Sequence, residues 1–306
     1  MNNNLLYHYT SADSFVGMIN GGKGVALKDH AIGEECVLSF WANSVYTMND
    51  PSEMMYGYEI VKQMIEKADT NKRLTSYYNQ IVVEDWSEEY KRAFFKEHFF
   101  NVEKTPFAIS FSHNDSEEDD NEELFMWSMY GDSGMGFRLG FDEDAMAYDG
   151  HRESGIKAFP VCYDEKSFED IYYPLLQQQV KAGYKDLERL SDPESIIWGK
   201  VSIIASVFTL FCSLIKNPKY RKEKEWRIVC FSNSTSFPDV KFRTRNSLII
   251  PYVERRVPIK YLKEIIVGPC CNYELQKRNV EMILKSCGVD IEMIRISKST
   301  IPYRNM

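Results

Sequence analysis

Short apolar segments with the alternation typical of β-strands recur along the whole chain, and their irregular spacing is the strongest constraint on its fold. Such segments lie at residues 5–9, 37–41, 105–112, 137–141, 156–163, 225–231, 247–253, 262–269 and 291–297. Helical segments interrupt them without a regular strand–helix–strand rhythm, which argues against a doubly wound parallel sheet and against a helix bundle. The pattern predicts one α+β domain over residues 1–306, with a mixed or antiparallel sheet and helical insertions over residues 52–100 and 166–216.

An uncharged apolar run, VSIIASVFTLFCSLI at residues 201–215, predicts a buried core helix. It is shorter than the ~20 apolar residues that a membrane-spanning helix requires, and Lys200 and Lys216 flank it. The N-terminus lacks the charged and apolar regions of a signal peptide, and the seven scattered cysteines include no CxxC motif. We therefore expect a cytoplasmic protein without a membrane partner.

The charge balance limits the partners that the chain can bind. Its 45 acidic and 37 basic residues give a net charge of −8, which disfavours a general nucleic-acid-binding face. One local basic segment, KNPKYRKEKEWR at residues 216–227, suits either a phosphate-bearing ligand or a solvated surface. The five histidines and the cysteines are not spaced as metal ligands, so we expect no metal site.

Motifs of several common enzyme classes are missing from the chain. The patterns GxGxxG, GxxxxGK[ST], HExxH and GxSxG do not occur in the structural context that each requires. The segment GMGFRLGF contains a Gly-x-Gly, but no phosphate-binding helix is predicted after it. The absence of these motifs weakens the dehydrogenase, P-loop ATPase, zinc protease and α/β-hydrolase hypotheses together.

Polar residues instead gather where predicted strands meet loops. His8 ends the first strand, Ser110 and Ser112 end the strand at 105–112, and Glu223 and Glu225 stand at the start of the strand at 225–231. Alternate residues of a strand share a face, so the two serines are expected to point together, as are the two glutamates. A sheet holds such side chains rigidly beside loops that leave room for a ligand.

The segment MNDPSE at residues 48–53 predicts the start of a helix. Asn49 or Asp50 can cap it, and Pro51 suits its first turn. Because Tyr46 lies nearby, the same segment is also a candidate pocket wall, and Asn49 is included among the expected cofactor-binding residues.

Six motifs, in order, resemble an uncharacterised bacterial family known as domain of unknown function 2971. They are LYHYTS, MNDPSE, FAISFS, WSMYGDSGMGFRLGF, EKEWRI and LKEIIVGP, and they extend over nearly the whole chain. The order His, Ser-x-Ser, Glu-x-Glu is also similar to that of the ADP-ribosyltransferase fold, and YHYT resembles the start of the DNA-targeting ADP-ribosyltransferase toxins. The middle motif departs from that fold, because bulky Phe111 stands where a small polar residue is usual.

The resemblance to the ADP-ribosyltransferase fold implies that NAD is the substrate. Cleavage of its nicotinamide bond passes through an oxocarbenium-like sugar, which a carboxylate stabilises. The resemblance assigns that catalytic role to Glu225 and the orientation of the acceptor to Glu223. It implies that His8 binds a ribose hydroxyl or the nicotinamide amide, while Ser110 and Ser112 brace the pocket and hold Glu225.

The other residues of the implied NAD site are aromatic, polar and basic. Tyr9, Tyr130 or Trp127 would stack on the nicotinamide ring, and Thr10 lies in the same motif as Tyr9. Arg227 would offer its guanidinium fork to the pyrophosphate.

The predicted function is therefore an NAD-using ADP-ribosyltransferase or NAD glycohydrolase, such as a bacterial toxin or an antiviral defence effector, with the acceptor left open. The alternative is a non-catalytic interaction protein of a defence or mobile-element system that binds a nucleotide or a protein partner. In that case Glu225 and Arg227 form a structural salt bridge that covers Trp226. The acidic segment HNDSEEDDNEE at 113–123 is expected to form a solvated loop. A metal-dependent nuclease is disfavoured, because no paired Asp/Glu cluster with metal spacing occurs outside this segment.

Overall fold

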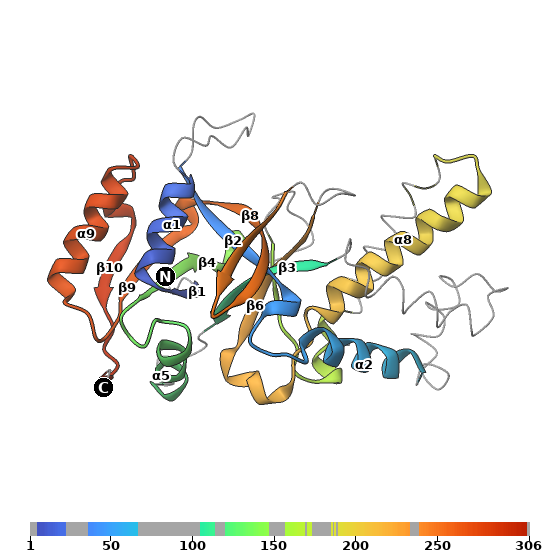
Figure 1. Cartoon of the computed structure of the whole chain (residues 1–306), viewed down its shortest axis with the longest axis horizontal. Coiled ribbons are helices and arrows are strands. Elements are labelled where there is room, and N and C mark those ends of the chain that lie inside the picture. The colour runs from blue at the N-terminus through green and yellow to red at the C-terminus, as the bar shows by residue number, and fades with distance from the viewer. Residues whose placement is uncertain are drawn as a thin grey trace.

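The computed structural model describes residues 5–22, 36–66, 105–113, 120–146, 157–168, 170–172, 185, 187, 189–232 and 239–304. Within these ranges, ten strands form one sheet, and helices lie beside it and at both of its ends (Figure 1). Parts of the helical insertions predicted over residues 52–100 and 166–216 lie outside the described residues.

The elements have the following bounds in the structure. The strands are β1 (Leu5–Thr10), β2 (Val37–Ser44), β3 (Pro106–His113), β4 (Phe137–Asp142), β5 (Ala158–Pro160), β6 (Glu225–Phe231), β7 (Val240–Arg245), β8 (Leu248–Pro258), β9 (Leu262–Val267) and β10 (Arg295–Lys298). The α-helices are α1 (Ala12–Gly22), α2 (Glu53–Glu66), α5 (Asp120–Met129), α6 (Glu143–Met146), α8 (Pro193–Cys212) and α9 (Tyr273–Lys285). The 3₁₀ turns are η1 (Val45–Thr47), η4 (Pro218–Glu223), η5 (Ile259–Tyr261) and η6 (Ile291–Met293).

The sheet is open and mixed. Its main path runs β10-β9-β4-β1-β3-β2-β8-β7, while β6 pairs with β3 and β5 pairs with β6. The β9–β10 pair is parallel and the other strand pairs are antiparallel. The structure thus confirms the predicted combination of helices with a mixed sheet.

Strand β3 lies at a fork in this sheet. On one edge, β6 pairs with it along its length, from Pro106 to Ser112. On the other edge, β1 pairs with Ser112 and His113, and β2 pairs with Phe107 and Ala108. Because β1 and β2 leave β3 in different directions, residues 109–111 lie between the two pairings, and the fork opens there.

The two faces of the sheet have different partners. On one face, apolar side chains of the central strands form a core with α1 and α9, in which Phe15 and Ile19 of α1 and Leu284 of α9 are buried. On the other face, α5 places Trp127 against Tyr9 and Ile266. Because side chains alternate along each strand, β1 contributes Leu6 to the first core and Tyr9 to the second.

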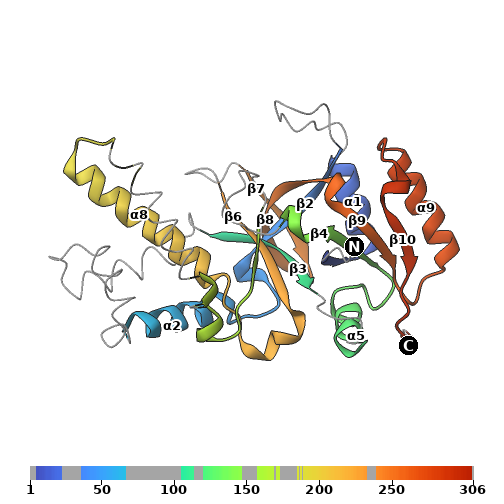
Figure 2. The ribbon, with the colours of Figure 1, turned by 180° about the vertical axis from the view of Figure 1, so that it is seen from behind.

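Helices α2 and α8 pack against each other and extend from one end of the sheet, while α9 lies at the opposite end (Figures 1 and 2). The apolar run at 201–215 forms part of α8 and the residues after it, and from Val207 on most of it is buried, as the sequence predicts for a core helix. Gly57 of α2 is required at the crossing, because any Cβ there would overlap the carbonyl group of Cys212. No described helix combines the length and apolar character that crossing a membrane requires.

The Gly-x-Gly of GMGFRLGF serves backbone packing and does not cradle a phosphate. Gly134 has a positive φ of 79° in the turn before β4. A Cβ on Gly136 would overlap the carbonyl oxygen of Thr10 at the end of β1. These glycines therefore let the turn after α5 lie directly against β1.

Two local predictions differ from the structure. The acidic segment 113–123 is expected to be a solvated loop, yet α5 begins within it at Asp120, and Glu123 accepts a hydrogen bond from Trp127 Nε1 at 3.0 Å. Strand β7, with the sequence VKFRTR, is missing from the predicted strands although its residues alternate. Because the strand is mostly exposed and carries several charged side chains, it lacks the apolar character by which a strand is recognised in a sequence.

Candidate functional site

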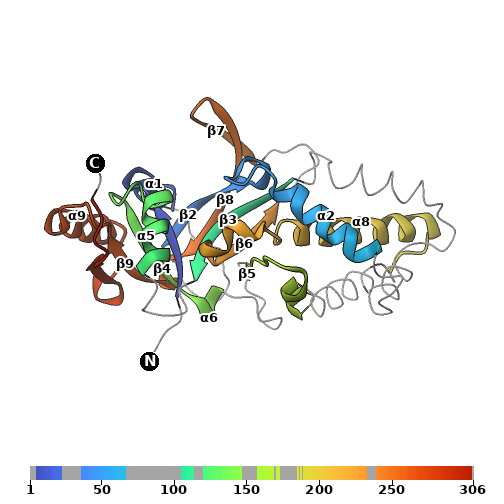
Figure 3. The same cartoon turned by 90° about the horizontal axis from the view of Figure 1, so that it is seen from below.

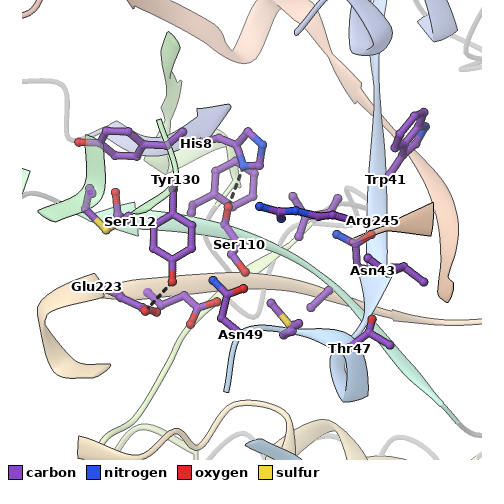
Figure 4. A pocket seen from close by; sticks show the side chains of 18 of the residues that line it. His8, Trp41, Asn43, Thr47, Asn49, Ser110, Ser112, Tyr130, Glu223 and Arg245 are labelled. Carbon is purple, nitrogen blue, oxygen red and sulfur yellow. Dashed lines mark hydrogen bonds between the residues drawn. The ribbon is translucent and has the colours of Figure 1, made fainter. Parts of the chain in front are cut away.

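A cavity of about 510 Å³ opens at the fork between β1, β2 and β3. It receives side chains from segments that are more than two hundred residues apart in sequence (Figure 4). Eight of the predicted site residues line it: His8, Tyr9, Asn49, Ser110, Ser112, Tyr130, Glu223 and Glu225. The structure therefore brings together the histidine, the serine pair and the glutamate pair that the sequence places at three separate strand ends.

His8 is fixed at the edge of β3. Its Nδ1 lies 2.8 Å from the carbonyl oxygen of Ser110, and its ring packs against Phe40 and Phe111. A carbonyl oxygen only accepts hydrogen bonds, so Nδ1 carries the proton and Nε2 is an acceptor when the ring is neutral. Burial lowers the pKa of His8, which favours this neutral form.

Ser110 and Ser112 point to one side of β3, as alternation predicts. Ser110 is paired with Arg227 and Ser112 with Glu225 in the register with β6, so these four side chains share a face of the sheet. The Ser112 hydroxyl lies 3.5 Å from the carbonyl oxygen of Tyr7. The Ser110 hydroxyl is buried and has no hydrogen-bond partner among the described residues. Figure 4 shows the Ser110 side chain pointing into the cavity.

Glu223 and Glu225 reach the cavity by a different route from the one that the sequence suggests. They were expected to alternate along one strand, but Glu223 ends the 3₁₀ turn η4 and only Glu225 belongs to β6. Lys224 between them has a left-handed backbone, with φ 41° and ψ 49°. This local reversal brings both carboxylates to the cavity while the Lys224 side chain forms an ion pair with Glu122.

Glu225 is held by a fully buried arginine. Arg227 donates from Nε to Glu225 Oε1 at 2.7 Å and from Nη2 to Oε2 at 2.8 Å. The same guanidinium donates from Nη1 to the Ser213 carbonyl oxygen and from Nη2 to Glu53 at the start of α2. Burial raises the pKa of Glu225, but Arg227 and Lys216 lower it by more. Its pKa therefore lies well below its usual range, and Glu225 is ionised.

Lys216 links the two glutamates of the cavity. Its Nζ lies 2.6 Å from Glu223 Oε2 and 2.8 Å from Glu225 Oε2. Burial lowers its pKa, but the surrounding carboxylates, with Glu225 foremost, raise it above its usual range, so the ammonium stays charged. Three carboxylates, including Glu53, thus surround two cations, and the fully ionised cluster carries one net negative charge.

Glu223 differs from Glu225 because its second oxygen faces a tyrosine. The Tyr130 hydroxyl donates to Glu223 Oε1 at 2.7 Å (Figure 4). Burial raises the pKa of Glu223 above its usual value, and Lys216 opposes this rise only in part. Glu223 therefore takes up a proton at a higher pH than an ordinary glutamate, whereas Glu225 stays ionised.

Three predicted site residues lie outside the cavity. Arg227 is 0% exposed and its guanidinium is occupied by Glu225, Ser213 and Glu53, so the prediction that it binds pyrophosphate is wrong. Trp127, also 0% exposed, packs edge-on against Tyr9 in the core below α5 and offers no face for stacking. Thr10 is buried at the end of β1, where its carbonyl group meets Gly136.

Sequence reasoning also missed several residues of the site. Lys216 belongs to the basic segment 216–227, but it is buried, with its Nζ on Glu225 of β6 and its backbone N–H donating to the carbonyl oxygen of Cys162. For Glu53, the sequence indicates only a position at the start of a helix. Arg243 and Arg245 lie on the unpredicted strand β7, and the alternation VKFRTR before the turn residues Asn246 and Ser247 is the signal that could have found them.

No group of three or more His, Cys, Asp or Glu side chains within the described ranges is placed to hold a metal ion. Residues 126–228 match the family described as "Protein of unknown function (DUF2971)". This segment includes Tyr130, Glu223 and Glu225, whereas His8 and Ser110 lie before it. No curated protein and no solved structure matches the chain, so the resemblance to the ADP-ribosyltransferase fold gains no support from these comparisons.

Proposed function

We propose that the cavity binds NAD and cleaves the bond between its nicotinamide and ribose, so that the protein is an NAD glycohydrolase or an ADP-ribosyltransferase. The observation that carries the proposal is the convergence of His8, Ser110, Glu223 and Glu225 on one cavity, although they lie on segments distant in sequence. The size of the cavity also suits it, because pockets for small ligands measure roughly 300–1,000 Å³.

The proposed reaction breaks the bond between C1′ of the ribose and the ring nitrogen of nicotinamide. The bonding electron pair leaves with nicotinamide, which neutralises its pyridinium charge, and C1′ becomes an oxocarbenium-like cation. The oxygen of water, or of an acceptor, then bonds to C1′ and loses a proton. A carboxylate beside the ribose stabilises the positive charge that develops at C1′ in the transition state more than it stabilises the ground state, in which that charge lies on the nicotinamide ring.

Glu223 is the better candidate for contact with the ribose. Both oxygens of Glu225 already accept from Arg227, and one of them also accepts from Lys216. Glu223 shares no bond with Arg227 in the structure, and its Oε1 accepts from Tyr130 at the cavity surface. The roles of the two glutamates are therefore exchanged relative to those that the resemblance implies: Glu223 contacts the reacting sugar and Glu225 positions Lys216.

His8 and Ser110 would bind the sugar or the amide from the opposite side of the fork. His8 Nε2 can accept from a ribose hydroxyl or an amide N–H, because its Nδ1 proton is already given to Ser110. The Ser110 hydroxyl can donate to the ligand, which would satisfy a group that has no described partner in the protein.

The proposal is tested by incubating the purified protein with NAD and measuring free nicotinamide and ADP-ribose by chromatography. The wild type is expected to release nicotinamide, and Glu223→Gln to lose turnover by roughly a hundredfold, within the range of single electrostatic contacts in active sites. Glu292→Gln, at an exposed carboxylate in η6, is the control and should match the wild type. If Glu223→Gln releases nicotinamide as fast as the wild type, the proposed role of Glu223 is wrong. If the wild type releases no nicotinamide, either in water or with protein and nucleic-acid acceptors present, the proposed activity is wrong.

A further inference from the structure

The hairpin of β7 and β8 forms the wall of the cavity across from Glu223. Figure 4 shows Arg245, Asn43 and Trp41 on this side, and Figure 3 shows the hairpin projecting from the sheet. Asn246 and Ser247 join the two strands with positive φ angles of 48° and 65°, as in a two-residue type I′ turn. This turn fixes the register in which alternate residues of β7 face the cavity.

Two cations of this wall have no acidic partner among the described residues. Arg243 and Arg245 are alternate residues of β7, so their side chains share the face that lines the cavity. Within the part of the chain that the structure describes, neither guanidinium forms an ion pair with a carboxylate. Arg243 donates only to the Asn43 side chain, from Nη2 at 3.1 Å and Nε at 3.4 Å.

The proximity of these two arginines is electrostatically unfavourable. Burial lowers the pKa of Arg243, and the positive charge of Arg245 lowers it further. The buried arginine of the neighbouring cluster, Arg227, is in contrast surrounded by Glu225 and Glu53. In a chain with a net charge of −8, an unneutralised pair of arginines at a cavity wall indicates an anionic ligand.

Trp41 of β2 adds an aromatic surface beside the two arginines of this wall. Its side chain lines the cavity and is 43% exposed, which is unusual for an indole held inside a sheet. Tyr252 supports it from a ring distance of 5.0 Å at an interplanar angle of 35°, and the Arg243 guanidinium lies 5.8 Å from its ring. The indole is therefore held in place with area left for stacking on a flat ligand ring.

We infer that the β7–β8 wall binds the diphosphate of a nucleoside diphosphate ligand, with Arg243 and Arg245 on the phosphates and Trp41 against the base. Each guanidinium fork matches two phosphate oxygens, and two forks on one strand face suit two linked phosphates. This assignment rests on the proposed function for the nucleotide class of the ligand and supplies the phosphate site that Arg227 does not provide. It orients the ligand with its base toward Trp41 and its reacting sugar toward Glu223.

Calorimetric titration with ADP-ribose, ADP and adenosine tests the inference without requiring turnover. Wild type is expected to bind ADP-ribose and ADP more tightly than adenosine, with an affinity that falls as salt rises. Arg245→Gln, at an exposed position outside the core, should weaken ADP-ribose binding roughly tenfold or more and leave adenosine binding unchanged. Arg278→Gln, at an exposed position of α9, is the matched control and should bind as the wild type does.

Trp41 variants test the base half of the site. Trp41→Ala should weaken both adenosine and ADP-ribose binding, and Trp41→Phe should restore much of it, because stacking tolerates either ring. Equal ADP-ribose affinity in wild type and Arg245→Gln, or no binding of either diphosphate at millimolar concentration, would overturn the inference. Binding of ADP-ribose that depends on Arg245, without NAD cleavage, would uphold this site while refuting the proposed function. NAD cleavage that does not depend on Arg245 would support the proposed function and refute this phosphate site.

Discussion

The hydroxyl of Tyr130 donates a hydrogen bond to Glu223 Oε1 at 2.7 Å and so joins α5 and its following turn to the segment before β6. Burial raises the pKa of Glu223, and the contacts with Lys216 and Tyr130 lower it in part. The protonation state of Glu223 thus depends on a residue that lies 93 positions away in the sequence.

Tyr130→Phe is expected to shift the acid limb of the pH dependence of NAD cleavage toward higher pH. The variant loses a hydrogen bond that favours ionised Glu223, so the carboxylate is protonated more readily. We expect kcat/KM at acidic pH to fall roughly threefold or more relative to its own plateau at alkaline pH. Initial rates across the pH range, for wild type and variant, measure the shift, and superimposable profiles would exclude this coupling.

Glu225→Gln is expected to destabilise the protein more than Glu223→Gln, because Glu225 pairs with both buried cations and Glu223 pairs with Lys216. It leaves Arg227 and Lys216 buried with one carboxylate fewer, and breaking a buried pair costs about 3–5 kcal/mol. The measurement is urea unfolding followed by circular dichroism. Arg221→Met is the control, because its ion pair with Asp164 is exposed and such pairs contribute about 0–1 kcal/mol. Equal stability of Glu225→Gln and wild type would show that the cluster does not support the fold.

The ionised carboxylate of Glu225 also makes the stability of the protein depend on pH. The pKa of Glu225 is lower in the folded protein than its usual value of 4.5, because Arg227 and Lys216 outweigh the effect of burial. Its contribution is therefore complete above pH 4.5 and is lost as the pH falls toward the folded-state pKa. Denaturation at a series of pH values below 5 should show a steeper loss of stability in wild type than in a folded Glu225→Gln variant, and parallel curves would argue against the ionised pair.

Gly136→Ala is expected to destabilise the turn that places α5 against β1. The added Cβ would overlap the carbonyl oxygen of Thr10, and backbone at both sides would have to move. We expect a loss of about 2 kcal/mol or more in the free energy of unfolding. Gly17→Ala in α1 is the matched control: its Cβ would have no atom within 4 Å, and alanine favours a helix by about 0.5–1 kcal/mol. Similar effects of the two substitutions would contradict the packing argument.

Much of the sheet could be predicted from sequence, because apolar alternation identifies strands such as β3 and β6 directly. The gathering of His8, Ser110 and Glu225 was predicted from positions at strand ends, but only Glu225 begins its strand, whereas His8 and Ser110 lie within β1 and β3 where the fork opens. Their individual environments did not follow, because burial depends on tertiary packing. The sequence allows Arg227 either to bind a phosphate or to pair with Glu225, and the structure shows the pair, with Glu53 of α2 as a second partner that the sequence does not indicate.

The fork between β1, β2 and β3 cannot be recognised from the local sequence. It arises because β1 and β2 pair with different ends of β3, and pairing partners are not encoded by the alternation of any one strand. Strand β7 was missed for another reason, since its exposed alternation of cationic and apolar residues resembles a solvated loop. The left-handed backbone at Lys224 likewise cannot be inferred from a residue type that seldom adopts it.

The most direct test of the account measures NAD cleavage and ADP-ribose binding together in wild type and Glu223→Gln. The account predicts that Glu223→Gln lowers kcat by roughly a hundredfold while the Kd for ADP-ribose changes by less than about threefold, since Glu223 acts on the reacting sugar and the β7–β8 wall holds the phosphates. A wild-type protein that binds ADP-ribose but releases no nicotinamide, or a Glu223→Gln variant with undiminished kcat, would contradict it.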